Sequence, residues 1–160
     1  MMRDVDENKV SSVMISDHAE EEDLLIQVEE AVERGEDALP KFEILEANLK
    51  RHIYAEEEIL FPRIEDGSWR PVVEELMNQH CAIWDGLREF KSNVGTSEAP
   101  KVLNRLYSLL KVHNSIEEGG VYGAVDDSMT TPLDLERVEV PLGWEPLFTI
   151  NGAGLRSRRY

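Results

Sequence analysis

The chain is short of cysteine, of basic side chains and of long apolar runs. Its 160 residues include a single cysteine, Cys81, so no internal disulfide can form and no oxidising compartment is needed. The 33 acidic side chains outnumber the 17 basic ones, and the net charge of −16 disfavours binding to nucleic acids or to anionic membrane surfaces. No apolar run approaches the roughly 20 residues of a membrane span, and residues 1–16 lack the apolar core of a signal peptide. We therefore expect a soluble, cytoplasmic protein with room for one domain.

Four stretches of the chain have apolar residues at alternating steps of three and four, the spacing of one helical face. They cover about residues 16–34, 37–61, 68–94 and 97–119. Gly35, Pro62 and Gly95 end the first three, and Gly119 with Gly120 ends the fourth. Because the links are short, the pattern predicts an all-α fold, an antiparallel up-down four-helix bundle.

The four predicted helices divide the chain into three segments. We expect a leader at 1–15, the bundle at 16–127 and an irregular C-terminal extension at 128–160 that is rich in proline and glycine. The extension either drapes over the bundle or contacts a second copy or another protein. Draping would bury Trp144, Leu147 and Phe148, whereas an interface would use the basic end at Arg156, Arg158 and Arg159. The sequence leaves both alternatives open.

Histidine is also scarce, and each of the four histidines lies on the apolar face of a different predicted helix: His18, His52, His80 and His113. A lone histidine on such a face is usually a satisfied core residue. Here, however, HIYAEEEILFPRIED from His52 aligns with HNSIEEGGVYGAVDD from His113, and DHAEEEDLL around His18 aligns with QHCAIWDGL around His80. The chain therefore has the pattern of a duplicated helical hairpin, in which each half has a lone histidine and then a His-x-x-x-Glu pair.

The spacing of the two His-x-x-x-Glu pairs indicates their chemistry. Residues four apart stack on one helical face, so each pair presents an imidazole beside a carboxylate to the interior. Iron and similar metals accept both ligand types, and buried carboxylates are far less costly when divalent cations lie between them. We predict six metal ligands: His18, His52, Glu56, His80, His113 and Glu117.

Other glutamates near the histidines belong to charge runs and are interpreted as solvated helix faces. They are Glu20, Glu21, Glu22, Glu57 and Glu58. Glu21 or Glu22 could still reach a metal from the side of His18, and the sequence does not decide this. Cys81 follows a predicted ligand but points about 100° away around the helix, so we expect a core or rim residue.

Three other metal architectures fit the sequence less well. Ferritin-like di-iron bundles need Glu-x-x-His, but the residues three positions before the histidines are Ile15, Leu49, Met77 and Leu110. The HExxH spacing of zinc proteases is absent, and one cysteine cannot build a thiolate zinc site. Haem held by a histidine pair would leave two buried glutamates unexplained.

These residues resemble the hemerythrin-like family with the histidine–histidine–glutamate (HHE) cation-binding domain. The resemblance spans about residues 16–127 and is most specific at HIYAEEEILFP from His52 and at HNSIEE from His113. It implies a four-helix bundle around two non-haem iron ions, with or without a bridging oxo or hydroxo group. It also implies that the four histidines are terminal ligands and that Glu56 and Glu117 bridge the ions.

The chain departs from the oxygen-carrying members of that family at one position. Those proteins have a second histidine one turn after the third-helix histidine, where this chain has Trp84. The remaining ligand set looks more like the branches linked to nitrosative or oxidative stress, to repair of iron–sulfur centres and to sensing of iron and oxygen. Tyr54, Ile83, Trp84 and Tyr122 are candidates to line a small-ligand pocket, with ordinary core packing as the alternative.

The predicted function is that of a non-haem di-iron protein that binds or reacts with O2, NO or peroxide, in sensing, stress response or iron handling. The alternative is a di-iron enzyme (a peroxidase, oxidase or NO reductase) or an iron donor for iron–sulfur cluster repair. A third candidate is an interaction domain in which the metal is structural. We expect small ligands as partners but no nucleic acid and no membrane, and a homodimer or protein contact through the extension is the alternative to draping.

Overall fold

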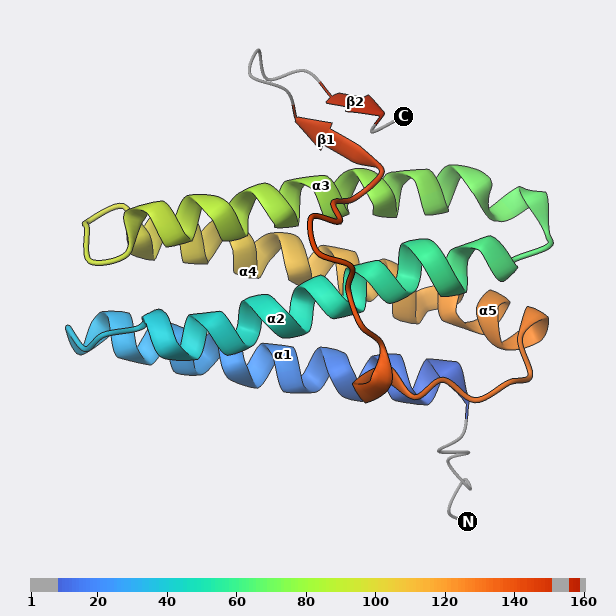
Figure 1. Ribbon diagram of the computed structural model, residues 1–160, viewed down its shortest axis with the longest axis horizontal. Coiled ribbons are helices and arrows are strands. Elements are labelled where there is room, and N and C mark those ends of the chain that lie inside the picture. The colour runs from blue at the N-terminus through green and yellow to red at the C-terminus, as the bar shows by residue number, and fades with distance from the viewer. Residues whose placement is uncertain (1–8, 151–155, 159–160) are drawn as a thin grey trace.

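The computed structural model describes residues 9–150 and 156–158, and four long helices dominate it (Figure 1). They are α1 (Val10–Glu33), α2 (Leu39–Ala55), α3 (Arg70–Asn93) and α4 (Ala99–Ile116). Consecutive helices run antiparallel, α1 packs against α2 and α3 against α4, and the two hairpins meet where α1 contacts α4 and α2 contacts α3. This arrangement confirms the predicted all-α bundle. No helix in the described part of the chain is long and apolar enough to cross a membrane.

The last three long helices each have a proline in the first turn, at Pro40, Pro71 and Pro100. Proline is tolerated there because the amide that it lacks would have no partner within the helix. Just before α2, the Asp37 carboxylate accepts a hydrogen bond from the Leu39 amide at 3.1 Å. The start of α2 is therefore defined by local side-chain and backbone chemistry that the sequence displays.

The first helix begins earlier than predicted, at Val10 rather than near residue 16. Val10 and Met14 are 2% and 0% exposed, and they pack with Tyr122 and Val125 at the far end of the bundle. Residues 10–15 were predicted as part of a leader, but they form the first turns of α1 because two of their side chains are needed to cover this apolar cluster.

The regular helix α4 ends at Ile116, shortly before the stop predicted at Gly119 and Gly120. The chain continues through a π-helical turn, η4 (Glu117–Val121), into α5 (Tyr122–Ser128). A Cβ atom on Gly120 would lie 2.7 Å from Cη2 of Trp69, so a glycine here lets the indole pack directly on the backbone. Gly120 thus permits close packing of Trp69, and its non-helical backbone (φ 177°, ψ −37°) kinks the chain within η4.

The second helix also continues, through short turns rather than a clean stop. These turns are the π-helical η1 (Glu56–Leu60) and the 3₁₀-helical η2 (Phe61–Arg63), and a separate 3₁₀ turn, η3 (Gly67–Trp69), leads directly into α3. Pro62 lies in η2, the 3₁₀ turn in which the helical run stops, close to the end or bend that the sequence predicts there. Each π-helical turn therefore begins at the glutamate of a His-x-x-x-Glu pair, at equivalent positions of the two halves of the chain.

Apolar side chains gather at the two ends of the bundle. The larger cluster includes Phe42 and Phe90, whose ring centroids are 4.6 Å apart, and it fills the end near the α1–α2 and α3–α4 links. Two smaller clusters lie toward α5, around Tyr122 and around Leu76. Along the helices, the four histidines lie between these apolar clusters. All four histidines are buried, with apolar side chains packed toward both ends of the bundle.

The segment after α5 crosses back over the bundle (Figure 1). It contains the 3₁₀ turn η5 (Leu135–Arg137) and a two-stranded antiparallel sheet of β1 (Phe148–Ile150) and β2 (Arg156–Arg158), with Phe148 opposite Arg158. Trp144 packs against the main core cluster, and β1 lies beside α3. In the described residues the extension thus drapes over the bundle, while the predicted basic contact residue Arg159 lies outside them.

Candidate metal centre

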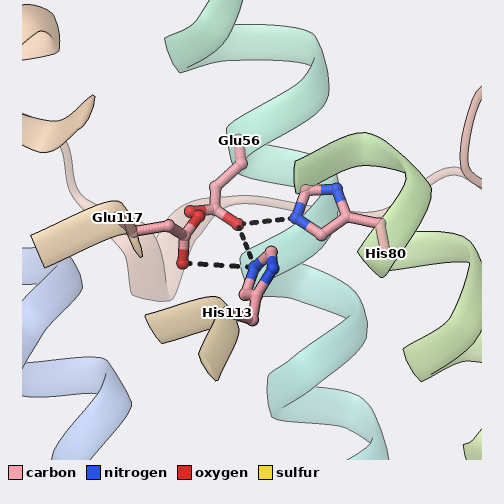
Figure 2. Close-up of side chains that lie close together, drawn as sticks. All are labelled: Glu56, His80, His113 and Glu117. Carbon is pink, nitrogen blue, oxygen red and sulfur yellow. Dashed lines mark hydrogen bonds and ion pairs between the residues drawn. The ribbon is translucent and has the colours of Figure 1, made fainter. Parts of the chain in front are cut away.

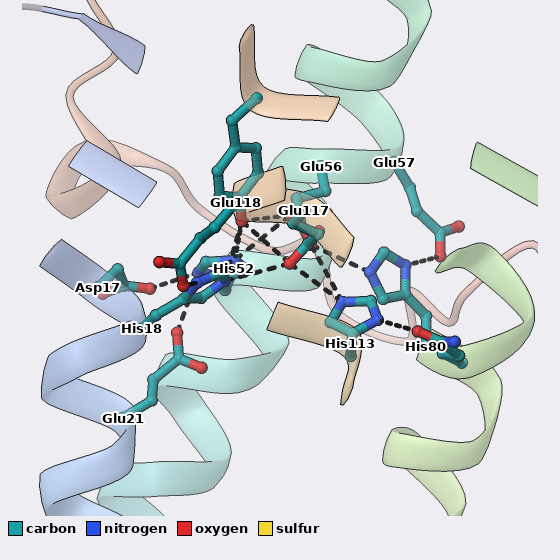
Figure 3. A network of polar contacts seen from close by, with 12 residues as sticks. Asp17, His18, Glu21, His52, Glu56, Glu57, His80, His113, Glu117 and Glu118 are labelled. Carbon is teal, nitrogen blue, oxygen red and sulfur yellow. Dashed lines mark hydrogen bonds and ion pairs between the residues drawn. The ribbon is translucent and has the colours of Figure 1, made fainter. Parts of the chain in front are cut away.

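The six predicted ligands come from every long helix and converge inside the bundle (Figure 3). One histidine lies on each of α1 to α4, and Glu56 and Glu117 are the first residues of the π-helical turns η1 and η4. None of the six is more than 5% exposed. π-helical turns occur often at functional sites, and here each one starts at a candidate ligand.

Glu56 lies between histidines from opposite sides of the bundle. Its Oε1 atom is 3.0 Å from Nε2 of His80 and 3.9 Å from Nε2 of His113 (Figure 2). Its other oxygen, Oε2, is 3.4 Å from Nε2 of His52. One carboxylate therefore faces imidazoles from both halves of the chain, as a bridging ligand must.

Glu117 is placed in the same way. Its Oε1 atom is 3.1 Å from Nε2 of His18 and 3.2 Å from Nε2 of His113. Its Oε2 atom is buried and has no hydrogen-bond partner in the described part of the chain. A buried carboxylate oxygen without a partner is costly, so this atom fits a site built for a cation.

The candidate ligand atoms form two adjoining groups, each with all atoms within 4.8 Å of one another. Glu56, His80, His113 and Glu117 make one group, and His18, His52 and Glu117 make the other. Because Glu117 belongs to both, the arrangement can hold two cations side by side. The structure thus brings together all six predicted residues.

The outer ring nitrogen, Nδ1, of each histidine faces an acceptor of its own (Figure 3). The acceptors are Glu118 for His18 at 2.9 Å, Asp17 for His52 at 2.6 Å, Glu57 for His80 at 2.7 Å and Gln79 for His113 at 2.8 Å. An acceptor at Nδ1 fixes the tautomer and the ring orientation and leaves Nε2 free to bind a metal. All four Nε2 atoms point inward, so the rings are oriented for coordination.

These acceptors repeat with the symmetry of the ligands. Asp17 and Gln79 directly precede the lone histidines, and each accepts from the paired histidine of its own half. Glu57 and Glu118 directly follow the candidate ligand glutamates, and each accepts from the lone histidine of the other half. The sequence duplication thus corresponds to a pseudo-twofold centre with a second layer of matched hydrogen bonds.

Two glutamates that were interpreted as solvated are buried, and that prediction was wrong for them. Glu57 is 9% exposed because it turns toward His80, and Glu21 is 3% exposed, with Oε1 at 3.0 Å from Nδ1 of His52. Burial raises the pKa of Glu21 to about 7. Glu21 lies at the outer nitrogen of His52, where Asp17, Glu21 and His52 form a third group of close metal-ligating atoms, while Glu22 is exposed.

Tyr122 breaks the symmetry of the centre. Its hydroxyl lies 2.8 Å from Oε2 of Glu56, 3.0 Å from Oε1 of Glu117 and 2.9 Å from Nε2 of His18. The equivalent residue of the other half is Phe61, whose ring stacks on His80 with centroids 6.0 Å apart. On the side of the centre with His18 and His52 there is therefore a hydroxyl group, whereas the side with His80 has a phenyl ring.

The other three candidate pocket residues do not reach the centre. Ile83 lies in the apolar core, while Tyr54 and Trp84 pack against Trp144 of the C-terminal segment, with ring centroids 5.1 and 5.6 Å apart. Ile83, Tyr54 and Trp84 are therefore packing residues, which was the alternative interpretation of the sequence. Cys81 is buried at 4% exposure and belongs to none of the groups of close metal-ligating atoms found in the described residues.

The buried carboxylates and imidazoles of the centre shift one another's pKa values. Burial opposes ionisation of Glu56, but the nearby imidazole of His52 and several hydrogen bonds hold its pKa well below the ordinary value. Burial also disfavours a charged imidazole at His113, yet the carboxylates of Glu117 and Glu56 raise its pKa to about 10. A cation that binds through His113 must displace its proton.

The family model described as hemerythrin HHE cation binding domain matches residues 9–125. The chain belongs to this family. Neither the curated proteins nor the solved structures include a match. The family resemblance and its bundle fold are confirmed, and the histidine–glutamate cluster of this hemerythrin-like chain could hold a metal.

Removing one shared carboxylate should cost the hemerythrin-like centre at least one cation. In Glu56→Ala the oxygens near His52, His80 and His113 are lost, so the variant should retain fewer than two metal ions per chain after loading with iron. Elemental analysis of the loaded protein measures this. The matched control, Cys81→Ala, should keep the wild-type metal content. Two ions in the Glu56→Ala protein would remove Glu56 from the bridging role.

Metal affinity should rise with pH. Below the His113 pKa of about 10 this imidazole is protonated in the metal-free protein, so a cation bound through His113 releases a proton. Every proton released makes the apparent affinity about tenfold higher per pH unit. Zinc titrations followed by calorimetry between about pH 6 and pH 8, in buffers of different ionisation enthalpy, measure both the slope and the proton release. A pH-independent affinity would contradict this.

Proposed function

We propose that the protein holds two non-haem iron ions between its four histidines and two shared glutamates, and that it binds or reacts with O2, NO or peroxide. The observation that supports this is the position of Glu56 and Glu117, each facing Nε2 atoms from both halves of the chain. Imidazole and carboxylate donors without thiolate are typical of non-haem iron, which supplies redox chemistry and binds small oxygen or nitrogen ligands.

The number of protein donors favours exchangeable positions at the centre. The group of His18, His52 and Glu117 offers two imidazoles and one carboxylate, the donor set that leaves open positions in non-haem iron proteins. All four histidines of the chain already belong to the two groups, and Trp84 stands where a further imidazole occurs in oxygen carriers. This supports a reactive or sensing role rather than simple oxygen carriage.

Residues around the centre would hold and select the small ligand. The Tyr122 hydroxyl lies 3.1 Å from Nε2 of His52 and close to Nε2 of His18, so it can donate a hydrogen bond to a group bound there. Apolar neighbours such as Leu60 and Val121 are fully buried and exclude water from the centre. A cavity of about 630 Å³ between α1 and α4 reaches His18 and Glu118, which gives small molecules an approach to this half.

The proposal predicts two iron ions per chain and an optical spectrum that changes between the oxidised and reduced protein. Iron-loaded protein should bind NO or consume peroxide in proportion to its iron content. Metal analysis with stopped-flow spectroscopy measures this. Stoichiometric reaction that then stops indicates a sensor or stress-response protein, whereas sustained turnover indicates the enzyme alternative. Fewer than one iron per chain, or an iron-loaded protein inert to NO, O2 and peroxide, would refute the proposal.

Tyr122→Phe should weaken ligand binding without loss of metal. The variant removes one hydroxyl donor near His18 and His52, and Phe61 shows that a phenyl ring is accommodated at the equivalent position. Loss of one such hydrogen bond corresponds to about 1 kcal/mol, so the NO dissociation constant should rise roughly fivefold. NO titration of the iron-loaded protein measures this, with Tyr54→Phe as the control. An unchanged NO affinity would place the hydroxyl outside the ligand's reach.

A further inference from the structure

The C-terminal segment is hydrogen-bonded to Glu57, beside the centre. The backbone amide of Leu147 donates a hydrogen bond to Oε1 of Glu57 at 2.9 Å. The other oxygen of Glu57 accepts from Nδ1 of His80 at 2.7 Å, and His80 is fully buried. Two hydrogen bonds, both to Glu57, therefore link the Leu147 amide to the ring of His80, whose Nε2 is a candidate metal-binding atom.

Contacts on either side of Leu147 hold this amide in place. The Trp144 indole donates to Oε1 of Glu58 at 2.9 Å, next to Glu57 on the same turn, and Pro146 is buried. The segment enters these contacts through a turn closed by a 3.0 Å hydrogen bond from the Trp144 amide to the Pro141 carbonyl. The third residue of that turn, Gly143, has a φ of 81°, as a type II turn requires.

The equivalent glutamate of the other half has different surroundings. Glu118 accepts from His18 just as Glu57 accepts from His80, but the Glu118 side chain is 39% exposed and lines the cavity between α1 and α4. The Glu57 side chain, by contrast, is 3% exposed beneath the C-terminal segment. The pseudo-twofold symmetry of the hydrogen bonds is therefore broken by the segment, which lies beyond the family-matched residues 9–125.

We propose that the Leu147 amide and Glu57 position His80, so that docking of the C-terminal segment strengthens cation binding at the half with His80 and His113. The inference rests on the proposed two-cation centre. An amide bonded to Oε1 restricts the Glu57 carboxylate, which then holds the His80 ring with Nε2 toward Glu56. Loss of such an outer partner typically lowers metal affinity about 10-fold to 100-fold.

The coupling must act in both directions. If docking of the segment raises the affinity for a cation, the bound cation stabilises docking by the same factor. The metal content of a buried centre would then change how firmly residues 144–148 are held at the surface. For a sensing protein, this converts occupancy of the centre into a difference that a partner can detect.

The test uses substitutions that separate the amide from the side chain of Leu147. Leu147→Pro removes the donor, whereas Leu147→Ala keeps it and removes the side chain. Leu142→Pro is the proline control, because Leu142 is fully exposed and is the second residue of the Pro141–Trp144 turn, where a type II turn favours proline. Zinc binding to the full chain, measured by calorimetry, avoids any dependence on redox reactivity.

Wild-type protein should bind two zinc ions per chain. In Leu147→Pro one of the two should bind about 10-fold to 100-fold more weakly, and the other should be unaffected. Leu147→Ala and Leu142→Pro should resemble the wild type. Circular dichroism of the metal-free variants establishes that each is folded. Equal losses in Leu147→Pro and Leu147→Ala would show that side-chain packing, not the amide, is responsible, and would overturn the proposal.

A double-mutant cycle tests whether the effect passes through Glu57. In a Glu57→Ala protein, Leu147→Pro should cause no further loss of zinc affinity, because the amide has no carboxylate left to restrain. A second full loss in the double variant would overturn the relay. This readout is specific to positioning, since a general loss of stability would add to the effect of Glu57→Ala.

Hydrogen exchange of the Leu147 amide provides the reciprocal readout. Zinc should slow its exchange in the wild type by a factor similar to the affinity change, and this protection should disappear in Glu57→Ala. Unchanged exchange on zinc binding would refute the coupling. Absence of zinc binding would refute the two-cation centre itself. Normal zinc results with an iron-loaded protein inert to NO, O2 and peroxide would refute only the proposed reactivity.

Discussion

Two carboxylates buried without exposure to water are the constraint around which the bundle is organised. Glu56 and Glu117 are both 0% exposed, and an isolated buried carboxylate costs several kcal/mol. Four inward-facing imidazoles offset that cost, and each imidazole then needs an acceptor for its outer nitrogen. The polar layer therefore extends outward from the glutamates until it reaches the surface, with apolar clusters above and below it.

Duplication of the helical hairpin explains why the hydrogen bonds of this layer repeat. The two sides of the centre nevertheless differ in the residues that surround them. One half has the Tyr122 hydroxyl and the cavity between α1 and α4. The other has Phe61 and is covered by the segment that carries Leu147. The centre thus has one side next to a cavity and one side hydrogen-bonded to a surface segment, although its candidate ligands are nearly symmetric.

Most of the fold and all six inner residues follow from spacing, because helical periodicity and the repeated His-x-x-x-Glu pairs are local signals. The outer layer was harder to predict. Glu57 lies in a run of three glutamates that has the composition of a solvated face, and only its equivalence to Glu118 in the repeat marks it as a partner of a histidine. The start of α1 at Val10 depends on burial against α5, which is a tertiary effect. Trp84 and Tyr54 pack against Trp144 rather than lining the centre, and such a contact between distant parts of the chain cannot be predicted from local spacing.

The π-helical turns have a consequence for which aromatic residue can reach the metal-binding level. Glu117 and Tyr122 are five residues apart, and in a regular α-helix such side chains would point about 140° away from each other. The wider turn of η4 brings them onto one face, where the Tyr122 hydroxyl touches the Glu117 carboxylate. In effect η4 holds one residue more than the α-helical turn it replaces, so a regular α-helix with the same number of residues would rotate the hydroxyl out of the centre while leaving every candidate ligand upstream in place.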